Sequence, residues 1–263
     1  MKFDNSKIQF SKFDIHRGIN LPKHLNEELA YLVGFHLGDG HMRQYRRSFG
    51  SIESTIFYDG HSINEYSHYE HYVCPLIKQL FNYKCKIKVR KNSNNLTVII
   101  GSRAIVDFMH LQCNLPLGPK TNACIPEIIK NANIKIKCAF LMGLADTDGS
   151  IVFKRKDNKY NDYPMIDFQM KSQHLIKDMA EMLRELGFNL HSSSRIKKRY
   201  EVEHESHYIQ LNGTKTLRKW MKLIGFTSPN HLTKIQVWEK YGHLPPRTNI
   251  IDRIKMLELG NNR

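Results

Sequence analysis

The chain has 263 residues, enough for one large or two small domains, and 41% of them are hydrophobic, as in ordinary folded proteins. It contains no long uncharged apolar run and no apolar segment near its start, so we expect neither a membrane-spanning helix nor a secretion signal. Forty Lys and Arg residues against 25 Asp and Glu residues give a formal net charge of +15. This charge favours a polyanionic partner, although by itself it does not separate DNA, RNA and an anionic membrane.

The cysteines indicate a reducing compartment. There are five, at positions 74, 85, 113, 124 and 138, and they form neither a CxxC pair nor a Cys/His spacing typical of a zinc site. We therefore expect free thiols and a location in the cytoplasm of a prokaryote or in an organelle, without secretion.

The first half of the chain begins with a polar arm, residues 1–25, and an apolar run, residues 29–38, that predicts a buried helix. Asn26 is expected to cap this helix, and the run ends in the pair Asp39-Gly40. After this pair we expect a strand at 51–58, a helix at 66–80, a strongly basic strand at 84–90, a returning strand at 96–100 and a short helix at 105–109.

The second half repeats this order. A second apolar run ends in Asp148-Gly149, which lies 148 − 39 = 109 residues after the first pair and predicts an internal duplication. We expect an arm at 1–25, a first half-domain at 26–130, a second half-domain at 131–242 and a tail at 243–263. The expected elements of the second half are a strand at 165–170, a helix at 175–186, a basic strand at 195–199, a returning strand at 208–211 and a helix at 217–224.

The two apolar runs share a pattern of small residues. Gly34 and Gly38 lie four residues apart in the first run. Gly143 and Thr147 have the same spacing in the second, so each helix has a face that another helix can approach closely. An Asp-Gly pair after an apolar run is usually no more than a helix end. The double occurrence favours a paired site, because packing of these two faces brings both Asp-Gly ends side by side.

The segments Leu32–Gly40 and Leu141–Gly149 both resemble the nonapeptide of the LAGLIDADG homing endonucleases, in the form that has two copies in one chain. The resemblance extends over residues 21–250. It implies an α+β fold of pseudo-two-fold duplicated αββαββα domains, whose two curved antiparallel sheets form a DNA-binding saddle. It also implies a monomeric, site-specific endonuclease that hydrolyses one phosphodiester in each strand of a long DNA site and leaves short 3′ overhangs.

The same resemblance assigns a catalytic site. Asp39 and Asp148 are expected to hold divalent metal, because carboxylates are the hard oxygen ligands that Mg²⁺ prefers. Mn²⁺ is expected to replace Mg²⁺, and Ca²⁺ to support binding without cleavage. The backbone carbonyls of Gly38 and Thr147 are expected to face the metal, and Lys120 is the expected basic residue of the cleft.

The second half departs from the family pattern, because it has no lysine at the matching place before Lys234. This leaves the second basic residue open. Asp146 is interpreted as a secondary group, an acceptor at the helix end. The polar residue that the family places at the end of each second strand corresponds to Asp59 or His61 in the first half, and to Gln169 or Ser172 in the second.

Side chains on the two sheets are the expected DNA contacts, since strands that face the major groove read bases and bind phosphates. The candidates are the cations and one tyrosine that follow each motif or lie on a basic strand. They are Arg43, Tyr45, Arg47, Lys86, Lys88, Arg90, Lys154, Lys156, Arg195, Lys197 and Arg199.

Two other functions fit the same family: an RNA maturase that assists intron splicing, and a non-catalytic DNA-binding relative. An aspartate in both motifs favours cleavage, because a maturase does not need the paired metal site. Since the chain begins at Met1 without a splicing-domain signature, we expect an intron-encoded protein rather than an intein, with intron RNA as an additional partner if it also acts as a maturase. No membrane partner is expected.

Overall fold

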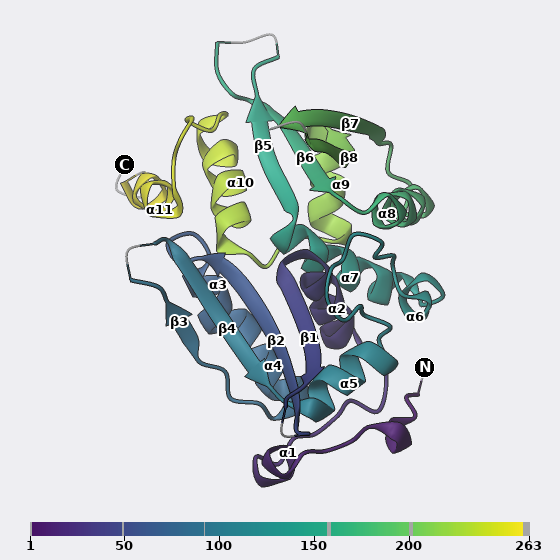
Figure 1. Cartoon of the computed structure of the whole chain (residues 1–263). Coiled ribbons are helices and arrows are strands. Elements are labelled where there is room, and N and C mark those ends of the chain that lie inside the picture. The colour runs from purple at the N-terminus through teal and green to yellow at the C-terminus, as the bar shows by residue number, and fades with distance from the viewer. Residues whose placement is uncertain (1, 49, 92, 157–158, 200–201, 260–263) are drawn as a thin grey trace.

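The computed structural model describes residues 2–48, 50–91, 93–156, 159–199 and 202–259, with the backbone alone at 197–199 and 202–204. It contains two four-stranded antiparallel sheets with the orders β1-β2-β4-β3 and β5-β6-β8-β7 (Figure 1). The predicted duplicated α+β fold is therefore confirmed. The strands are β1 (Gly40–Arg46), β2 (Ile52–His61), β3 (Ile87–Val89), β4 (Asn95–Gly101), β5 (Gly149–Lys154), β6 (Tyr163–Met170), β7 (His191–Arg199) and β8 (Val202–Asn212).

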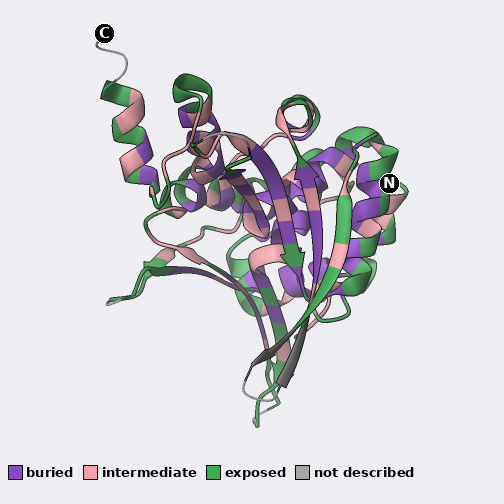
Figure 2. Cartoon of the chain, turned by 90° about the horizontal axis from the view of Figure 1, so that it is seen from above, coloured by how far each residue is buried: buried purple, intermediate pink, exposed green. Residues whose placement is uncertain are grey.

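Helices cover one face of each sheet, and buried side chains are concentrated where helices and strands meet (Figure 2). No helix in the described part of the chain is both long and apolar enough to cross a membrane. The helices are α1 (Lys12–His16), α2 (Glu27–Asp39), α3 (Tyr66–His68), α4 (Cys74–Phe81), α5 (Arg103–Leu111), α6 (Glu127–Lys130), α7 (Ile134–Thr147), α8 (Gln173–Glu185), α9 (Thr214–Leu223), α10 (Pro229–Tyr241) and α11 (Ile250–Leu259), with a 3₁₀ turn η1 (Asn5–Lys7) and a π-helical turn η2 (Tyr69–Val73).

The two motif helices, α2 and α7, pack against each other at the centre of the molecule (Figure 1). Two glycines permit their close approach. A Cβ on Gly34 would overlap the Phe140 carbonyl oxygen, and a Cβ on Gly143 would overlap the Tyr31 carbonyl oxygen. The backbones therefore meet with no side chain between them, as the spacing of small residues predicted.

The two sheets have the same pairing register at the motifs. Gly40 pairs with Tyr58 in the first sheet, and Gly149 pairs with Phe168 in the second. Because side chains alternate along a strand, each sheet has one face that packs on helices and one that carries polar and charged residues. We refer to the second as the open face. In the first sheet it includes Arg43, which is exposed, whereas its neighbour Met42 is fully buried.

Several segments differ from expectation, among them the short helices α1 and α6, which were not predicted, and strand β7, which begins at His191 rather than at 195. The basic strand of the first half is shorter than predicted, since only Ile87–Val89 is paired. The helix α10 was not predicted, although Pro229 at its first position and Ser228 before it are typical of a helix start. Its apolar and polar residues do not alternate with a clear helical period, because it is covered both by β5 and by α11. The five cysteines are all free, as expected.

We predict that Gly34→Ala destabilises the protein by about 3 kcal/mol, because the new methyl group must displace the backbone of α7. Gly101→Ala is the matched control, since a Cβ at that position meets nothing within 4 Å. Urea unfolding followed by circular dichroism measures both. Equal midpoints for the two variants would contradict the close helix packing.

Candidate active site

Asp39 and Asp148 lie at the C-terminal ends of the paired helices, Asp39 as the last residue of α2 and Asp148 as the cap of α7. The glycine after each aspartate lets the chain enter its first strand directly. A Cβ on Gly40 would overlap the His36 ring, and a Cβ on Gly149 would overlap the Ala145 carbonyl oxygen. Both aspartates are half-buried, so their carboxylates lie in the seam between the halves.

The electrostatics of this seam are unfavourable to negative charge. Burial raises the pKa of Asp39 well above its ordinary value, and the nearby carboxylates of Glu65 and Asp148 raise it further. Burial also raises the pKa of Asp148, while the Lys120 ammonium opposes the shift at both aspartates. The two motif carboxylates thus lie close enough for the charge of one to affect the other, and the half-buried Lys120 ammonium interacts with both.

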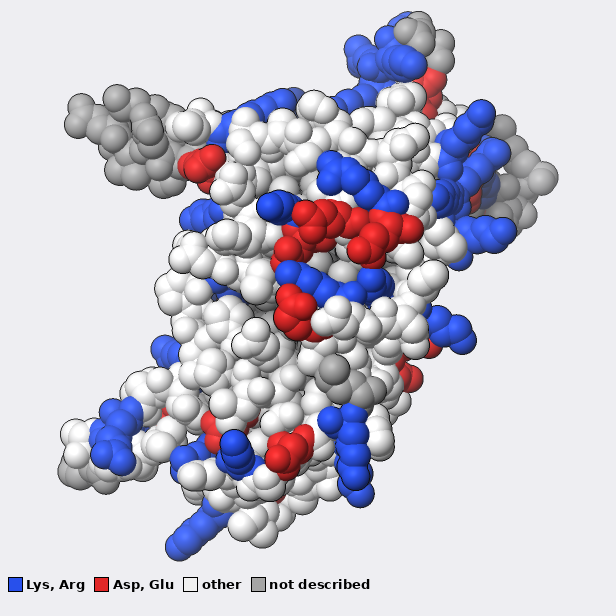
Figure 3. Space-filling model, turned by 90° about the vertical axis from the view of Figure 1, so that its right-hand side faces the viewer, with Lys and Arg blue, Asp and Glu red and all other residues white. Residues whose placement is uncertain are grey.

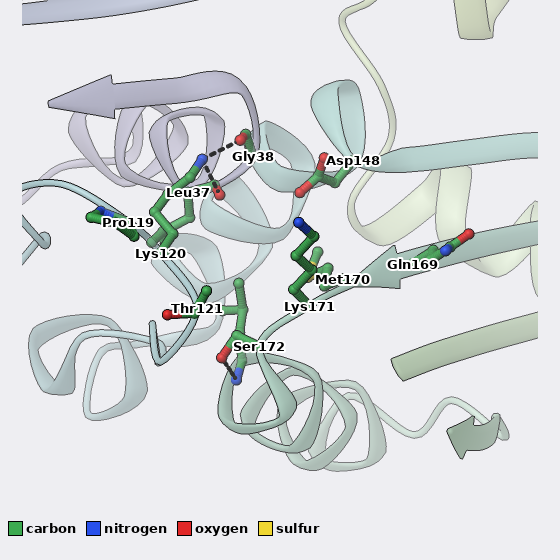
Figure 4. A pocket seen from close by; sticks show the side chains of 11 residues that line it. Leu37, Gly38, Pro119, Lys120, Thr121, Asp148, Gln169, Met170, Lys171 and Ser172 are labelled. Atoms are coloured by element: carbon green, nitrogen blue, oxygen red, sulfur yellow. Dashed lines mark hydrogen bonds between the residues drawn. The ribbon is translucent and has the colours of Figure 1, made fainter. Parts of the chain in front are cut away.

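Lys120 binds the end of helix α2. Its Nζ donates to the Leu37 carbonyl oxygen at 2.8 Å and to the Gly38 carbonyl oxygen (Figure 4), with a longer contact of 3.3 Å to the His36 carbonyl oxygen. A cation at a helix C-terminus satisfies carbonyl groups that have no partner within the helix. Burial lowers the pKa of Lys120, and Asp148 and Asp39 oppose this effect.

A pocket of about 390 Å³ opens between the halves and is lined by Gly38, Lys120 and Asp148 together with residues that follow strand β6. One of these is Lys171, whose side chain extends toward the Asp148 carboxylate (Figure 4). Sequence analysis missed this residue. The available signal was its place directly after the predicted strand at 165–170, where the family has a polar residue.

Lys234, the candidate left open by the sequence, does not line this pocket. Its Nζ donates to the Ile151 carbonyl oxygen at 3.3 Å, and burial next to Arg253 lowers its pKa to about 8. The lysine thus packs between α10 and β5. The position of a basic residue beside Asp148 is taken by Lys171.

The surroundings of the two motif aspartates are not symmetric. The shared register places Asp59 of β2 and Gln169 of β6 at equivalent positions. Asp59 accepts a hydrogen bond of 2.5 Å from the Thr97 hydroxyl. Glu65, whose pKa is raised by burial, accepts from the His61 amide at 2.6 Å. The first half therefore adds carboxylates near Asp39, whereas the second half adds a neutral amide and a lysine near Asp148.

Asp146 is not at the pocket but in the interior. Its carboxylate accepts from the Tyr31 hydroxyl at 2.8 Å, from the Thr227 hydroxyl at 2.6 Å and from the amides of Thr227 and Ser228 at 3.0 to 3.1 Å. His68 joins the same network through Tyr31, at 3.1 Å. Asp146 is therefore an acceptor, as predicted, and it also connects the second motif to Tyr31 of the first half.

Gly38 and Thr147 lie against each other across the helix pair, since a Cβ on Gly38 would overlap the Thr147 hydroxyl. That hydroxyl donates to the carbonyl oxygens of Gly143 at 3.3 Å and Leu144 at 3.0 Å. No group of three or more His, Cys, Asp or Glu side chains in the described residues is arranged to hold a metal. A divalent ion at this seam would therefore need backbone carbonyls beside the two carboxylates, a set of hard oxygen donors that suits Mg²⁺.

The predicted DNA contacts lie on or next to the open faces. Arg43 lies over the rings of Tyr45 and Phe57, at 5.6 and 4.8 Å, and Arg47 donates to Glu53 at 2.7 Å. In the second sheet Lys156 lies 5.0 Å from the Tyr163 ring and Arg195 lies 5.3 Å from the Tyr208 ring. Lys86, Lys88, Arg90 and Lys154 are exposed, and the side chains of Lys197 and Arg199, on strand β7, lie outside the described ones.

The side of the molecule that carries α6 and α8 has a different charge pattern. Acidic and basic side chains alternate there around a hollow (Figure 3). Lys130 pairs with Glu127 at 3.2 Å and with Asp178 at 2.9 Å, and Lys137 pairs with Glu185 at 2.6 Å. Lys130 and Lys137 on this side are thus neutralised by carboxylates of the protein.

The fold and the paired motif helices agree with comparisons to known proteins. Residues 135–225 match the family model described as LAGLIDADG-like domain. A structure of the homing endonuclease I-DmoI is similar with a TM-score of 0.52 and 19% identity, over 76% of this chain and 95% of that one. I-DmoI in complex with DNA and Mn gives a TM-score of 0.50 at 19% identity, over 76% and 96%. I-SmaMI bound to uncleavable DNA gives 0.50 at 16%, over 88% and 97%.

The predicted resemblance to the LAGLIDADG homing endonucleases is therefore confirmed, and the chain has their fold. Two curated proteins also match. The glutamine–fructose-6-phosphate aminotransferase of Methanocaldococcus jannaschii is 27% identical over 220 residues, which are 83% of this chain and 18% of that protein. The tRNA-splicing ligase RtcB of Methanopyrus kandleri is 24% identical over 223 residues, which are 75% of this chain and 20% of that protein. The chain spans about a fifth of the length of these relatives.

We predict that Asp39→Asn makes the metal-free protein more stable at pH 7.5. The raised pKa of Asp39 means that the folded state holds this proton more tightly than the unfolded state, so stability falls as pH rises from about 4 through the folded pKa. The amide removes that loss, at about 1.4 kcal/mol for each pKa unit involved.

Thermal unfolding in EDTA at pH 7.5 and at pH 3.5 checks this expectation. The advantage of Asp39→Asn should shrink at the lower pH, where wild-type Asp39 is protonated in both states. Glu181→Gln, at an exposed position of α8, serves as the control. If Asp39→Asn were less stable than wild type at pH 7.5, the negative charge of Asp39 would not be unfavourable in the folded protein, contrary to its burial beside Glu65 and Asp148.

Proposed function

We propose that the protein is a site-specific DNA endonuclease that cuts both strands of a duplex at the seam between its halves. The observation that carries this proposal is the pair of half-buried carboxylates, Asp39 and Asp148, held at adjacent helix ends beside the Lys120 ammonium. One carboxylate per half and one open sheet face per half suit a substrate with two antiparallel strands. The DNA complexes of I-DmoI and I-SmaMI, with the same fold, support duplex DNA as the substrate.

The carboxylates of Asp39 and Asp148, with the carbonyl oxygens of Gly38 and Thr147, would hold the divalent ion. A bound Mg²⁺ lowers the pKa of its water and neutralises charge on a phosphate. Structures of I-DmoI with its target DNA have been determined in the presence of Mg and of Mn, which supports divalent metal for this chain as well. The raised pKa of each motif carboxyl fits the same role, since buried acids without sufficient counter-charge bind cations favourably.

The chain's own lysines complete the site. Lys120 lies between the end of α2 and both carboxylates, so its ammonium can stabilise negative charge that develops on a phosphate in the pocket. Lys171 enters the pocket from the opposite half and extends toward Asp148 (Figure 4). We infer that Lys171 is the second basic residue, with Lys120 serving the strand cut near Asp39 and Lys171 the strand cut near Asp148.

The alternative functions are less favoured by the energetics of the seam. Burying two carboxylates that repel each other destabilises the fold, and neither an RNA maturase nor a non-catalytic DNA-binding protein needs them ionised there. An endonuclease needs them as metal ligands. We propose further that the protein acts as a monomer, because the internal duplication supplies both halves of the site, and that it is encoded within an intron.

Cleavage of a randomised duplex library in Mg²⁺ tests the proposal directly. Wild type should cut both strands of a selected site and leave short 3′ overhangs. Asp39→Asn and Asp148→Asn should each lower the rate of double-strand cleavage by at least about 100-fold, while both bind the selected duplex in Ca²⁺. Full activity in both variants would refute the assignment.

Lys171→Met is predicted to slow one of the two cuts by about 100-fold, because the thioether keeps the length of the side chain but not its charge. A supercoiled plasmid that carries the selected site should then accumulate in nicked form, whereas wild type converts it to linear DNA. Lys177→Met, an exposed position on α8, is the control. If Lys171→Met yields linear DNA at the wild-type rate, Lys171 is not the second basic residue.

A further inference from the structure

The N-terminal arm is packed onto the first half-domain. Asp14 of α1 is fully buried, and its Oδ2 accepts the Ser11 amide at 2.9 Å and the Ala104 amide at 3.2 Å, which ties α1 to the start of α5. The Asn82 side chain donates to the Gly18 carbonyl oxygen at 3.0 Å. The arm therefore holds a fixed position at the end of the first sheet that lies away from the second (Figure 1).

The arm places one cation at the edge of this sheet. The Arg17 guanidinium donates to the Gly101 carbonyl oxygen at 2.8 Å, at the end of β4. It lies near two rings, 6.0 Å from that of Phe13 and 5.6 Å from that of Tyr83. These contacts fix the guanidinium plane, while only one of its donor groups is used for the hydrogen bond to Gly101.

Arg17 forms one wall of a groove of about 510 Å³. The other cations that line it are Lys84, Lys86 and Lys88, and none of its lining residues is acidic. None of these four cations forms an ion pair with a carboxylate in the described part of the chain. Four unpaired like charges around one groove repel each other, so an anion that binds there is favoured.

The groove continues the open face of the first sheet. Lys88 of β3 pairs with Thr97 of β4. Ile99, two residues further along β4, lines the groove and pairs with Phe57 of β2. Arg43 lies over the same Phe57 ring. The groove therefore begins beside the predicted strand contacts and extends past edge strand β3 to the arm.

We propose that this groove binds the sugar-phosphate backbone of the target duplex outside the segment that faces the strands, with Arg17 and Lys84 as phosphate contacts. The inference rests on the proposed endonuclease function, because it takes the open face as the DNA surface. A duplex is the occupant that fits best, since its backbone has a regular line of charges and the groove lies in line with the strand contacts. In the residues that the structure describes, α6 precedes α7 of the second half-domain and no arm lies at the far end of its sheet, so we expect the footprint to extend further at the first half than at the second.

The experiment compares wild type with Arg17→Ala/Lys84→Ala in Ca²⁺, by fluorescence anisotropy on the selected duplex over a series of salt concentrations. The slope of log affinity against log salt should become shallower by about 1.8, or 0.9 for each lost phosphate contact. Truncating the duplex by several base pairs at the end under the first half should abolish the difference between wild type and variant. Truncation at the other end should leave that difference intact.

Arg218→Ala/Lys222→Ala is the matched control, with the same loss of charge on exposed positions of α9. Helix α9 covers the opposite face of the second sheet through Trp220, whose ring lies 5.9 Å from that of Phe168. Because Arg17 also anchors the arm, Lys84→Ala alone serves as a second test and should reduce the slope by about 0.9. Unchanged slopes in both Arg17→Ala/Lys84→Ala and Lys84→Ala, with normal binding by wild type, would overturn this inference alone. Absence of duplex binding by wild type would overturn the proposed function as well.

Discussion

The backbone contact between α2 and α7 determines the rest of the molecule. Because Gly34 and Gly143 leave no side chain between the helices, the helix ends come together and the aspartate near the end of each motif enters a shared, partly dehydrated seam. The sheets are then fixed to either side, since the first strand of each half follows its helix directly through a glycine. A Cβ on Gly40 would overlap His36, and a Cβ on Gly149 would overlap the Ala145 backbone. A single steric condition thus sets the separation of the carboxylates, the position of the pocket and the relative placement of the two open faces.

This arrangement has an energetic cost. Burial raises the pKa values of Asp39 and Asp148, and the charges of Glu65 and Asp148 raise that of Asp39 further. The Lys120 ammonium, itself partly dehydrated, opposes both shifts. The interior compensates elsewhere. Asp146 is more deeply buried than either, yet its carboxylate is satisfied by hydroxyl and amide donors. Asp146 is thus a structural acid, with hydrogen-bond donors supplied by the fold. Asp39 and Asp148 have too little positive charge around them to offset their own, which is typical of functional acids.

Much of this could be predicted from the sequence, because it depends on local pattern. The Asn26 cap, the two motif helices and the repeated succession of helices and strands follow from periodicity and from small residues at fixed spacing. The parts that could not be predicted depend on tertiary contacts. Lys171 and Lys234 are both lysines near a turn or helix start, and only the packing of α10 places Lys234 against β5 and leaves Lys171 beside Asp148. The role of Asp146 was likewise hidden, since its partners Tyr31 and Thr227 are 115 and 81 residues away in the chain.

The network around Asp146 also makes the two halves chemically different where they meet. The position of Asp146 in the second motif is held by Leu37 in the first, and the position of Tyr31 is held by Phe140 in the second. In a pair made of two second halves, the Asp146 carboxylate would meet the Phe140 ring. In a pair made of two first halves, the Tyr31 hydroxyl would meet the Leu37 side chain. Self-pairing of either kind would lose the Tyr31–Asp146 hydrogen bond, leaving Asp146 only its donors from Thr227 and Ser228, or Tyr31 only its contact with His68. The covalent heteropair adds a buried hydrogen bond between the halves, so each half is the better complement of the other.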